Sequence, residues 1–480
     1  MKKFWNSIKQ LIWPGANASL PRRILPYSGI VFFGLLALVV SVVGWEYTNS
    51  TSFCGTICHT MPPQYLTYLR SPHSRVGCVE CHLGREIITT QLPRKLEHTS
   101  TVYALIFNTY EFPIVAKKMR PASEACETCH YPRQFSDDNL REMRYHESDE
   151  ANSLRSTFLV MKIGGGARRS DQGHGIHWHI GNKVTFIATD ELQQNIPYIR
   201  WEDESGKVKE YYDLAGGITP ENVGSQKQQA MDCITCHNRD AHAIPSPAQT
   251  VDNAMFQNSI SDDLPFLRKQ AVDLLSADYP DFNAAKRAFS SIESYYQEKY
   301  PEVYSSHRKD IRQAILFLEN AYQQIRFPEQ KMDWTSHPDN LGHKDSPGCF
   351  RCHDGKHISP SGEAIRLECN LCHSIPVPSD PSKYVTDIRV LRGAEPLSHT
   401  STHWIAIHGK ALDSTCARCH PPLNPTTDYS RLSGKKPPLD GSFCGNTACH
   451  ASEWKFTGFR NPALKNILDN ELKSLPPAPR

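Results

Sequence analysis

The sequence lacks any bias of charge. Its 480 residues contain 53 lysines and arginines against 51 aspartates and glutamates, and no run of basic residues is present. Because nucleic-acid binding depends on clustered positive charge, we exclude nucleic acid as an expected partner. Hydrophobic residues make up only 39% of the chain, which is little for two or three domains of this total length. Polypeptide alone therefore supplies a modest apolar core.

No cysteine is left over when one pattern is applied to the chain. Six segments have the form Cys-x-x-Cys-His, and two wider segments keep the terminal Cys-His. The eight segments use all sixteen cysteines: Cys54 and Cys58, Cys78 and Cys81, Cys126 and Cys129, Cys233 and Cys236, Cys349 and Cys352, Cys369 and Cys372, Cys416 and Cys419, Cys444 and Cys449. Disulfides or a zinc site would leave cysteine pairs without a following histidine. The pattern therefore predicts eight covalently bound c-type haems.

Each motif also supplies an iron ligand. The histidine that ends it is the predicted proximal ligand, which gives His59, His82, His130, His237, His353, His373, His420 and His450. Of 22 histidines, fourteen remain, and low-spin electron-transfer haems take a second axial nitrogen. We predict distal ligands among His73, His177, His179, His242, His343, His357, His399, His403 and His408. For any one of these, the alternative is an ordinary surface histidine.

Two pairs of these predicted distal ligands lie close together in the sequence or near a particular motif. In Gly175-Ile-His-Trp-His179 the two histidines would project to the same side of a strand, and one of them would reach a haem iron. His343 and His357 are expected around the fifth motif, because His357 follows Cys352-His353 much as His242 follows the fourth motif.

One long uncharged apolar run is present, and no Ala-x-Ala cleavage site follows it. Residues 29–45 are just long enough to span a bilayer, and the missing cleavage site argues against a removed signal peptide. Arg22 and Arg23 precede the run and Glu46 follows it. The positive-inside rule then predicts a cytoplasmic segment 1–25, an anchor 26–46 in the cytoplasmic (inner) membrane, and haem domains in the periplasm.

The expected fold is mainly α and irregular, with a small β insertion and a helical spacer. Alternation at residues 183–188, 198–201 and 208–212 predicts strands, the last two joined by a turn at 204–207. Residues 251–330 contain no cysteine, and their apolar spacing predicts three helices at 264–275, 284–300 and 302–326. A C-terminal domain with four motifs, 331–455, and an exposed tail, 456–480, follow.

The order of motifs behind the anchor resembles a known family. Cys-His-Thr-Met61, Ser-Pro-His73, Cys-His82, Cys-His130 and Cys-His-Asn-Arg-Asp-Ala-His242 are similar to the NapC/NirT family of membrane-anchored tetrahaem quinol dehydrogenases. That family oxidises menaquinol or ubiquinol and passes electrons to periplasmic reductases. The resemblance implies such a domain at 47–250, with a long insertion at 131–232. It extends to larger inner-membrane multihaem cytochromes of metal-respiring bacteria.

The resemblance also implies a quinol site. In the family, a lysine and an acidic residue beside the first haem are associated with quinol, and the acid precedes a Val-Tyr pair. Thr101 occupies that position here. The resemblance then implies Arg94 or Lys95 in the basic role and Glu97 or His98 as proton acceptor. It further implies Met61 as a possible iron ligand in place of His59.

The expected function is quinol oxidation by an octahaem cytochrome, followed by electron transfer to periplasmic cytochromes or reductases in anaerobic respiration. One alternative is a terminal reductase for nitrite, hydroxylamine or a sulfur oxyanion, but such sites commonly replace the motif histidine by lysine, and all eight motifs here keep it. A passive electron conduit fed by a separate membrane partner is the third reading. The anchor fits both a conduit and a quinol oxidase.

Overall fold

The structure of the protein is a computed structural model. It describes residues 5, 19–58, 60–84, 88–97, 99–116, 119–131, 138–164, 175–203, 205–374, 376–379, 406–408, 455–458 and 462–474. Several predicted site residues lie outside these ranges: His59, His98, His399, His403, His420, His450, Cys416, Cys419, Cys444 and Cys449. The roles of these residues, and with them the seventh and eighth motifs, stay predictions.

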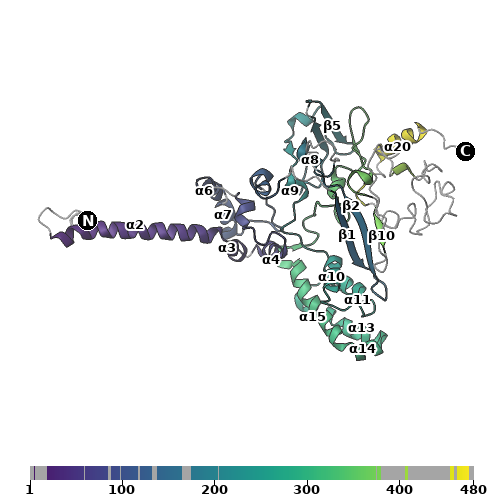
Figure 1. Ribbon diagram of the computed structural model, residues 1–480, viewed down its shortest axis with the longest axis horizontal. Helices are drawn as coiled ribbons and strands as arrows, with labels where there is room; N and C mark the ends of the chain where they lie inside the picture. The colour runs from purple at the N-terminus through teal and green to yellow at the C-terminus, as the bar shows by residue number, and fades with distance from the viewer. Residues whose placement is uncertain are drawn as a thin grey trace.

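The predicted anchor lies within one long helix, α2 (Leu20–Asn49). The most apolar 18-residue stretch within Arg23–Asn49 has a mean hydropathy of 2.3, and none of that stretch is buried within the protein. Thirty helical residues extend about 45 Å, more than the roughly 30 Å of a bilayer core. Figure 1 shows α2 as a rod that projects away from the rest of the chain. Its exposed apolar surface is suited to lipid.

Short helices gather where α2 ends. They are α3 (Thr51–Thr56), α4 (Pro62–Arg70), α5 (Cys78–His82), α6 (Ile88–Glu97) and α7 (Thr99–Phe107). Ser50 caps α3 by accepting a hydrogen bond from the amide of Phe53. In α3, a side chain at Gly55 would come within 2.1 Å of the Tyr65 ring, so glycine lets α3 and α4 approach closely.

Two antiparallel sheets follow (Figure 1). In one, β1 (Asn139–His146), β2 (Leu154–Met161) and β10 (Val377–Ser379) lie in that order. The other has the order β6-β3-β4-β5-β9, with β3 (Lys183–Ile187), β4 (Tyr198–Glu202), β5 (Val208–Asp213), β6 (Gln229–Ala230) and β9 (His357–Ile358). The three predicted strands are confirmed as β3, β4 and β5. The longest strands, β1 and β2, were not predicted from the sequence.

The insertion and the C-terminal part share both sheets. Strand β9 pairs with β5, placing Ile358 opposite Tyr212, and β10 pairs with β2, placing Val377 opposite Phe158. Residues beyond the helical region therefore complete sheets begun in the insertion. This differs from the predicted grouping, in which 331–455 forms a domain of its own. Strands of two or three residues have too little periodicity to be seen in a sequence.

Between these sheet segments the chain forms a helical bundle, at the bottom of Figure 1. It contains α10 (Pro247–Phe256), α11 (Leu267–Ser276), α12 (Phe282–Phe289), α13 (Ser291–Lys299), α14 (Pro301–Ser306) and α15 (Arg308–Ile325). Ile311, Leu318 and Ile325 on α15 are buried, as the apolar spacing predicted. The predicted helix 284–300 is divided at Ser290, and Pro301 begins α14. A short strand pair, β7 (Arg326–Phe327) and β8 (Met332–Asp333), follows.

A buried ion pair joins this bundle to the β1–β2 hairpin. Arg268 donates two hydrogen bonds to Asp252, of 2.8 and 3.0 Å, and the amide of His146 on β1 donates a third, of 3.0 Å. Asn152 adds two bonds of 2.8 Å to the carbonyls of Asp262 and Leu264. Burial alone would raise the pKa of Asp252, but the bonds from His146 and Arg268 outweigh it and lower the pKa to about 2.

We predict that Asp252→Asn loosens this junction. A fall of the pKa from 3.8 to about 2 corresponds to about 2 kcal/mol of stability, present above pH ~4 and lost as pH falls towards 2. Hydrogen exchange followed by mass spectrometry should therefore show α11 amides exchanging on the order of 30-fold faster at neutral pH. Asp273→Asn is the control, since its pair with Lys269 is exposed. Equal exchange in the two variants would contradict the prediction.

Candidate haem and quinol sites

The second to sixth motifs each form one short helical turn. The second and fourth lie in α5 and α9 (Cys233–Cys236), and the third, fifth and sixth in the 3-10 helices η2 (Cys126–Thr128), η6 (Gly348–Arg351) and η7 (Cys369–Leu371). A turn brings residues i and i+3 to one side, so both cysteines face the same way. The twelve described cysteines form no disulfide among themselves. The thiols are thus available for thioether bonds.

Five motif histidines each face a histidine from elsewhere in the chain. The pairs, with their ring-centre distances, are His82 and His242 at 6.3 Å, His130 and His73 at 6.1 Å, His237 and His177 at 6.4 Å, His353 and His179 at 5.8 Å, and His373 and His343 at 6.4 Å. Every pair combines one predicted proximal ligand with one predicted distal ligand. The five gaps between ring centres are nearly equal in length.

These gaps fit an iron ion held between two imidazoles. A metal–imidazole bond is about 2 Å long, so two such bonds on opposite sides of one ion place the ring centres roughly 6 Å apart. The ring orientation agrees: Nδ1 lies 3.0 Å from the Gln64 carbonyl in His242 and 2.8 Å from the Ile176 carbonyl in His179. A carbonyl only accepts, so Nδ1 donates and Nε2 is left as the coordinating nitrogen. The residues present therefore fit c-type haems with two histidine ligands.

Two local expectations differ from the structure. His177 and His179 do not lie in a strand: His177 precedes the short helix α8 (Trp178–Gly181), and the two rings face different motifs, the fourth and the fifth. His343 stacks on Phe350 of the fifth motif, with ring centres 4.3 Å apart, as expected, but the histidine that it faces, His373, belongs to the sixth motif. At His177 and His179 the turn into α8 sends neighbouring side chains in different directions, which sequence spacing alone does not reveal.

His357 is placed as a structural residue, in contrast to the predicted iron ligand. Its Nδ1 lies 2.9 Å from Asp354, and its Nε2 lies 2.7 Å from the carbonyl of Ile196. The side chain is buried, and neither ring nitrogen is left for iron. His357 instead joins the fifth motif to the second sheet. The remaining described candidate, His408, is half-buried, and its role as a ligand stays a prediction.

The six described motifs neighbour one another in chain order. The Cys54 side chain lies against Cys78, and Cys126 against Cys233. Cys81 is within electrostatic reach of Cys129, Cys236 of Cys349, and Cys349 of Cys372. These contacts link the first motif to the second and so on to the sixth. The arrangement suits stepwise electron transfer.

Arg351, inside the fifth motif, holds that motif against the fourth. Its guanidinium donates to the carbonyls of Gly348, Gln193 and Thr235, at 2.9, 2.9 and 2.7 Å, and Thr235 lies between the cysteines of the fourth motif. The sequence offered no signal for this role, because an arginine between two motif cysteines is usually exposed. The Thr235 carbonyl accepts a second hydrogen bond, of 3.0 Å, from the side chain of Asn340.

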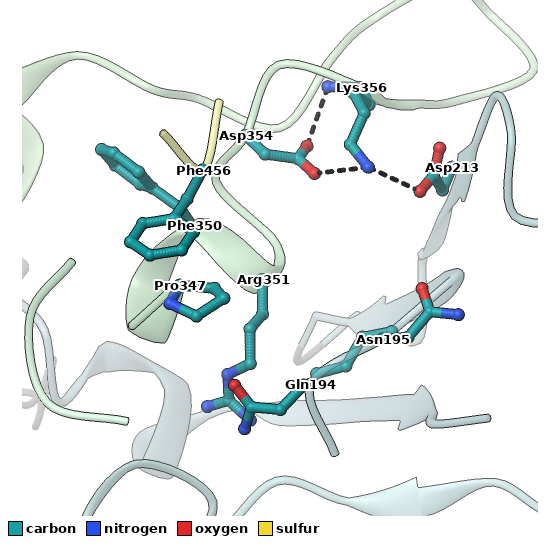
Figure 2. A pocket seen from close by; sticks show the side chains of 10 residues that line it. Gln194, Asn195, Asp213, Pro347, Phe350, Arg351, Asp354, Lys356 and Phe456 are labelled. Atoms are coloured by element: carbon teal, nitrogen blue, oxygen red, sulfur yellow. Dashed lines mark hydrogen bonds and ion pairs between the residues drawn. The ribbon is translucent and has the colours of Figure 1, made fainter. Parts of the chain in front are cut away.

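A cavity lies beside the fifth motif, as Figure 2 shows. Charged groups that line it form ion pairs with one another: Lys356 lies 2.9 Å from Asp213 and 3.3 Å from Asp354. Arg351, which points into the same space, is bound to main-chain carbonyls. The cavity is thus a hollow between paired charges, and its polar groups position the fifth motif.

The predicted quinol residues are divided between two surfaces of α6. Lys95 donates to the Thr48 hydroxyl at 2.9 Å and lies 4.3 Å from the centre of the Trp45 ring, at the end of α2. Burial lowers the pKa of Lys95, and the nearby Cys54 opposes this effect. Arg94 instead faces the second motif, where it lies 3.0 Å from Glu124. Consecutive helical residues point about 100° apart, which explains the division.

Two further residues complete this region. Glu97 is half exposed and lies 3.8 Å from Arg120. Met61 precedes the first residue of α4, directly after the first motif. The pairings, the quinol residues and Met61 all stay predictions as ligands or reactants.

Comparison with known proteins identifies the family. The profile of the NapC/NirT cytochrome c family, N-terminal region, matches residues 22–148. Cytochrome c-type protein ImcH of Geobacter sulfurreducens is 37% identical over 349 residues, which cover 72% of this chain and 68% of ImcH. This chain belongs to the NapC/NirT cytochrome c family. Cytochrome c-type protein NrfH of Wolinella succinogenes is 30% identical over 117 residues, covering 22% of this chain and 66% of NrfH.

The cytochrome c nitrite reductase subunit NrfH of Nitratidesulfovibrio vulgaris is 33% identical over 75 residues, covering 16% of this chain and 46% of that subunit. No solved structure matches the chain. The predicted family and fold class are confirmed: the protein is a membrane-anchored multihaem cytochrome c of the inner membrane that takes part in electron transfer and binds c-type haem covalently.

The imidazole pairs predict opposite results for two nearby histidines. In His343→Ala, the haem on the sixth motif loses its second nitrogen ligand, so one additional haem should become high-spin in the ferric EPR spectrum of the purified holoprotein. In the matched variant His357→Ala, every haem should keep its spin state, because His357 has no nitrogen free for iron. A high-spin haem in His357→Ala, or none in His343→Ala, would refute this pairing.

Proposed function

We propose that this protein is an octahaem quinol dehydrogenase. Its N-terminus lies in the cytoplasm, its haem domains lie in the periplasm, and it passes electrons from menaquinol or ubiquinol to periplasmic cytochromes or reductases. Each quinol releases two electrons and two protons, whereas each haem accepts one electron at a time. Three things are therefore needed: a quinol site at the membrane, a proton acceptor and a series of neighbouring haems.

Lys95 is the observation that carries this proposal. Its ammonium group lies at the level where α2 ends, between Trp45 and Thr48, and within electrostatic reach of Cys54 in the first motif. A quinol reaching this level from the bilayer would meet a hydrogen-bond donor directly beside the first haem. Tryptophan at the membrane surface is also typical of such an interface.

The neighbouring residues take different roles. Arg94 is engaged by Glu124 and by the carbonyl of Leu83, so Lys95 rather than Arg94 is the basic residue that we assign to quinol. Glu97, two residues further along α6 and partly exposed, is the described candidate for proton acceptor, and His98 is the other. Neither depends on the acidic residue that Thr101 replaces.

The pairing of histidines favours electron transfer over terminal reduction. A terminal reductase binds its substrate at an iron with an open face. Five motif histidines each face a second imidazole at 5.8–6.4 Å, an arrangement that fills both axial positions. Those haems are then suited to relay electrons in motif order from the membrane to the C-terminal part. We propose that the module 47–250 receives electrons and that the motifs of 331–455 deliver them.

The proposal predicts eight haems per chain. Haem content, measured by the pyridine haemochrome method against protein concentration, should give eight per chain, and intact mass should agree. The variant Cys444→Ala, Cys449→Ala should give seven, because the widest motif then lacks both sulfurs. A value of seven in both proteins would mean that this widest motif binds no haem.

The proposal also predicts that Lys95→Met slows reduction by quinol. Losing a hydrogen bond from a charged donor costs about 1.5–3 kcal/mol, so the rate should fall roughly tenfold or more. The measurement is anaerobic stopped-flow spectroscopy of the oxidised holoprotein in detergent, mixed with a menaquinol analogue. Lys183→Met, which alters an exposed lysine on β3, is the control.

Reduction by dithionite should be the same in all three proteins. If quinol reduces none of them while dithionite reduces all, the quinol assignment is wrong, and a conduit fed by another membrane protein replaces it. Re-oxidation of the reduced protein by nitrite or hydroxylamine would instead favour a terminal reductase.

A further inference from the structure

Six paired histidines have an Nδ1 partner among the described residues, and one of the six differs from the other five. The Nδ1 atom of His237, in the fourth motif, lies 2.7 Å from the Oδ2 atom of Asp240. Five other paired histidines bond through Nδ1 to main-chain carbonyls: His177, His179, His242, His353 and His373. A carboxylate carries a full negative charge, whereas a carbonyl is neutral. The fourth motif therefore presents an unusually electron-rich ligand.

Asp240 is held in this position by the turn that follows α9. The side chain of Asn238 donates to the carbonyl of Pro338 at 2.9 Å and accepts from the amide of Asn340 at 3.0 Å. The guanidinium of Arg239 donates to the carbonyl of His242. Main-chain bonds on both sides thus fix the turn, and Asp240 requires no rearrangement to reach His237.

Asp240 faces a second pair as well. Besides its hydrogen bond with His237, the Asp240 carboxylate lies within electrostatic reach of His73 and His130. His73 and His130 form the pair of the third motif. A single carboxylate therefore lies beside the ligands of two consecutive haems, bonded to one and near the other.

We propose that Asp240 is a positioning residue that lowers the reduction potential of the haem on the fourth motif, and more weakly that of the haem on the third. A histidine that donates to a carboxylate is a more basic ligand, and a more basic ligand stabilises ferric over ferrous iron. The nearby negative charge acts in the same direction. The proposal deepens the proposed function, since it rests on the haems assigned to these two motifs.

The location gives this residue a consequence for electron transfer. The fourth motif is the last of the family module, and Arg351 holds it against the fifth motif in the C-terminal part. A lowered potential at this haem makes it harder to reduce at the junction. The step between the two halves then depends in part on this carboxylate.

The test is a redox titration of the full-length holoprotein, followed by optical and EPR spectra with chemical mediators. In Asp240→Asn, which keeps the shape but removes the charge, one low-spin haem should shift to a higher midpoint potential and a second should shift less in the same direction. Asp240→Glu, which keeps the charge, should shift less than Asp240→Asn. Haem content and low-spin signals should stay unchanged in both variants.

Asp339→Asn is the matched control. Asp339 also acts on His237 by its charge, but its Oδ1 atom bonds to the amide of Leu341. No shift in Asp240→Asn, or an equal shift of the same haem in Asp339→Asn, would overturn the proposal. Mediators rather than quinol set the potential, so this result is independent of whether the protein oxidises quinol.

Discussion

The structure depends on one constraint: five of the motif histidines each face a second imidazole from another part of the chain. The motif itself is local, a single helical turn with two thiols and a histidine. The second ligand is not, because His242 reaches the second motif across the whole insertion and His179 reaches the fifth motif across the helical bundle. Histidine pairing thus brings distant segments together, and bound haems would supply apolar surface that a chain of 39% hydrophobic residues does not.

The same constraint explains the insertion that separates this chain from the tetrahaem pattern it resembles. Residues 131–232 contribute His177 to the fourth motif and His179 to the fifth. Their strands accept β9 and β10 as edge strands, and β1 is fastened to the helical bundle through Asp252. Sheets, bundle and motifs are therefore connected through the insertion, which places the C-terminal motifs against the family module.

The sequence predicted what is local and missed what depends on three-dimensional contact. The motifs follow from exact spacing, and the apolar run of α2 and the stripe of α15 follow from composition and periodicity. His357 was misjudged by analogy with His242, although it follows its motif histidine one residue sooner. That shorter loop turns its ring towards Asp354 and Ile196. Arg351 and Asp240 were overlooked, because their roles depend on partners that no spacing rule specifies.

The geometry at α8 adds a final constraint on how the two halves work together. His177 and His179 are two residues apart, so the pairs they form on the fourth and fifth motifs are joined by a rigid turn rather than a flexible linker. Arg351 makes the same connection from the opposite side through Thr235. Electron transfer between neighbouring cofactors depends on their separation. Here two features fix the distance between the fourth and fifth motifs: the short chain segment from His177 to His179, and the hydrogen bond from Arg351 to Thr235. Two independent connections therefore hold the fourth motif against the fifth.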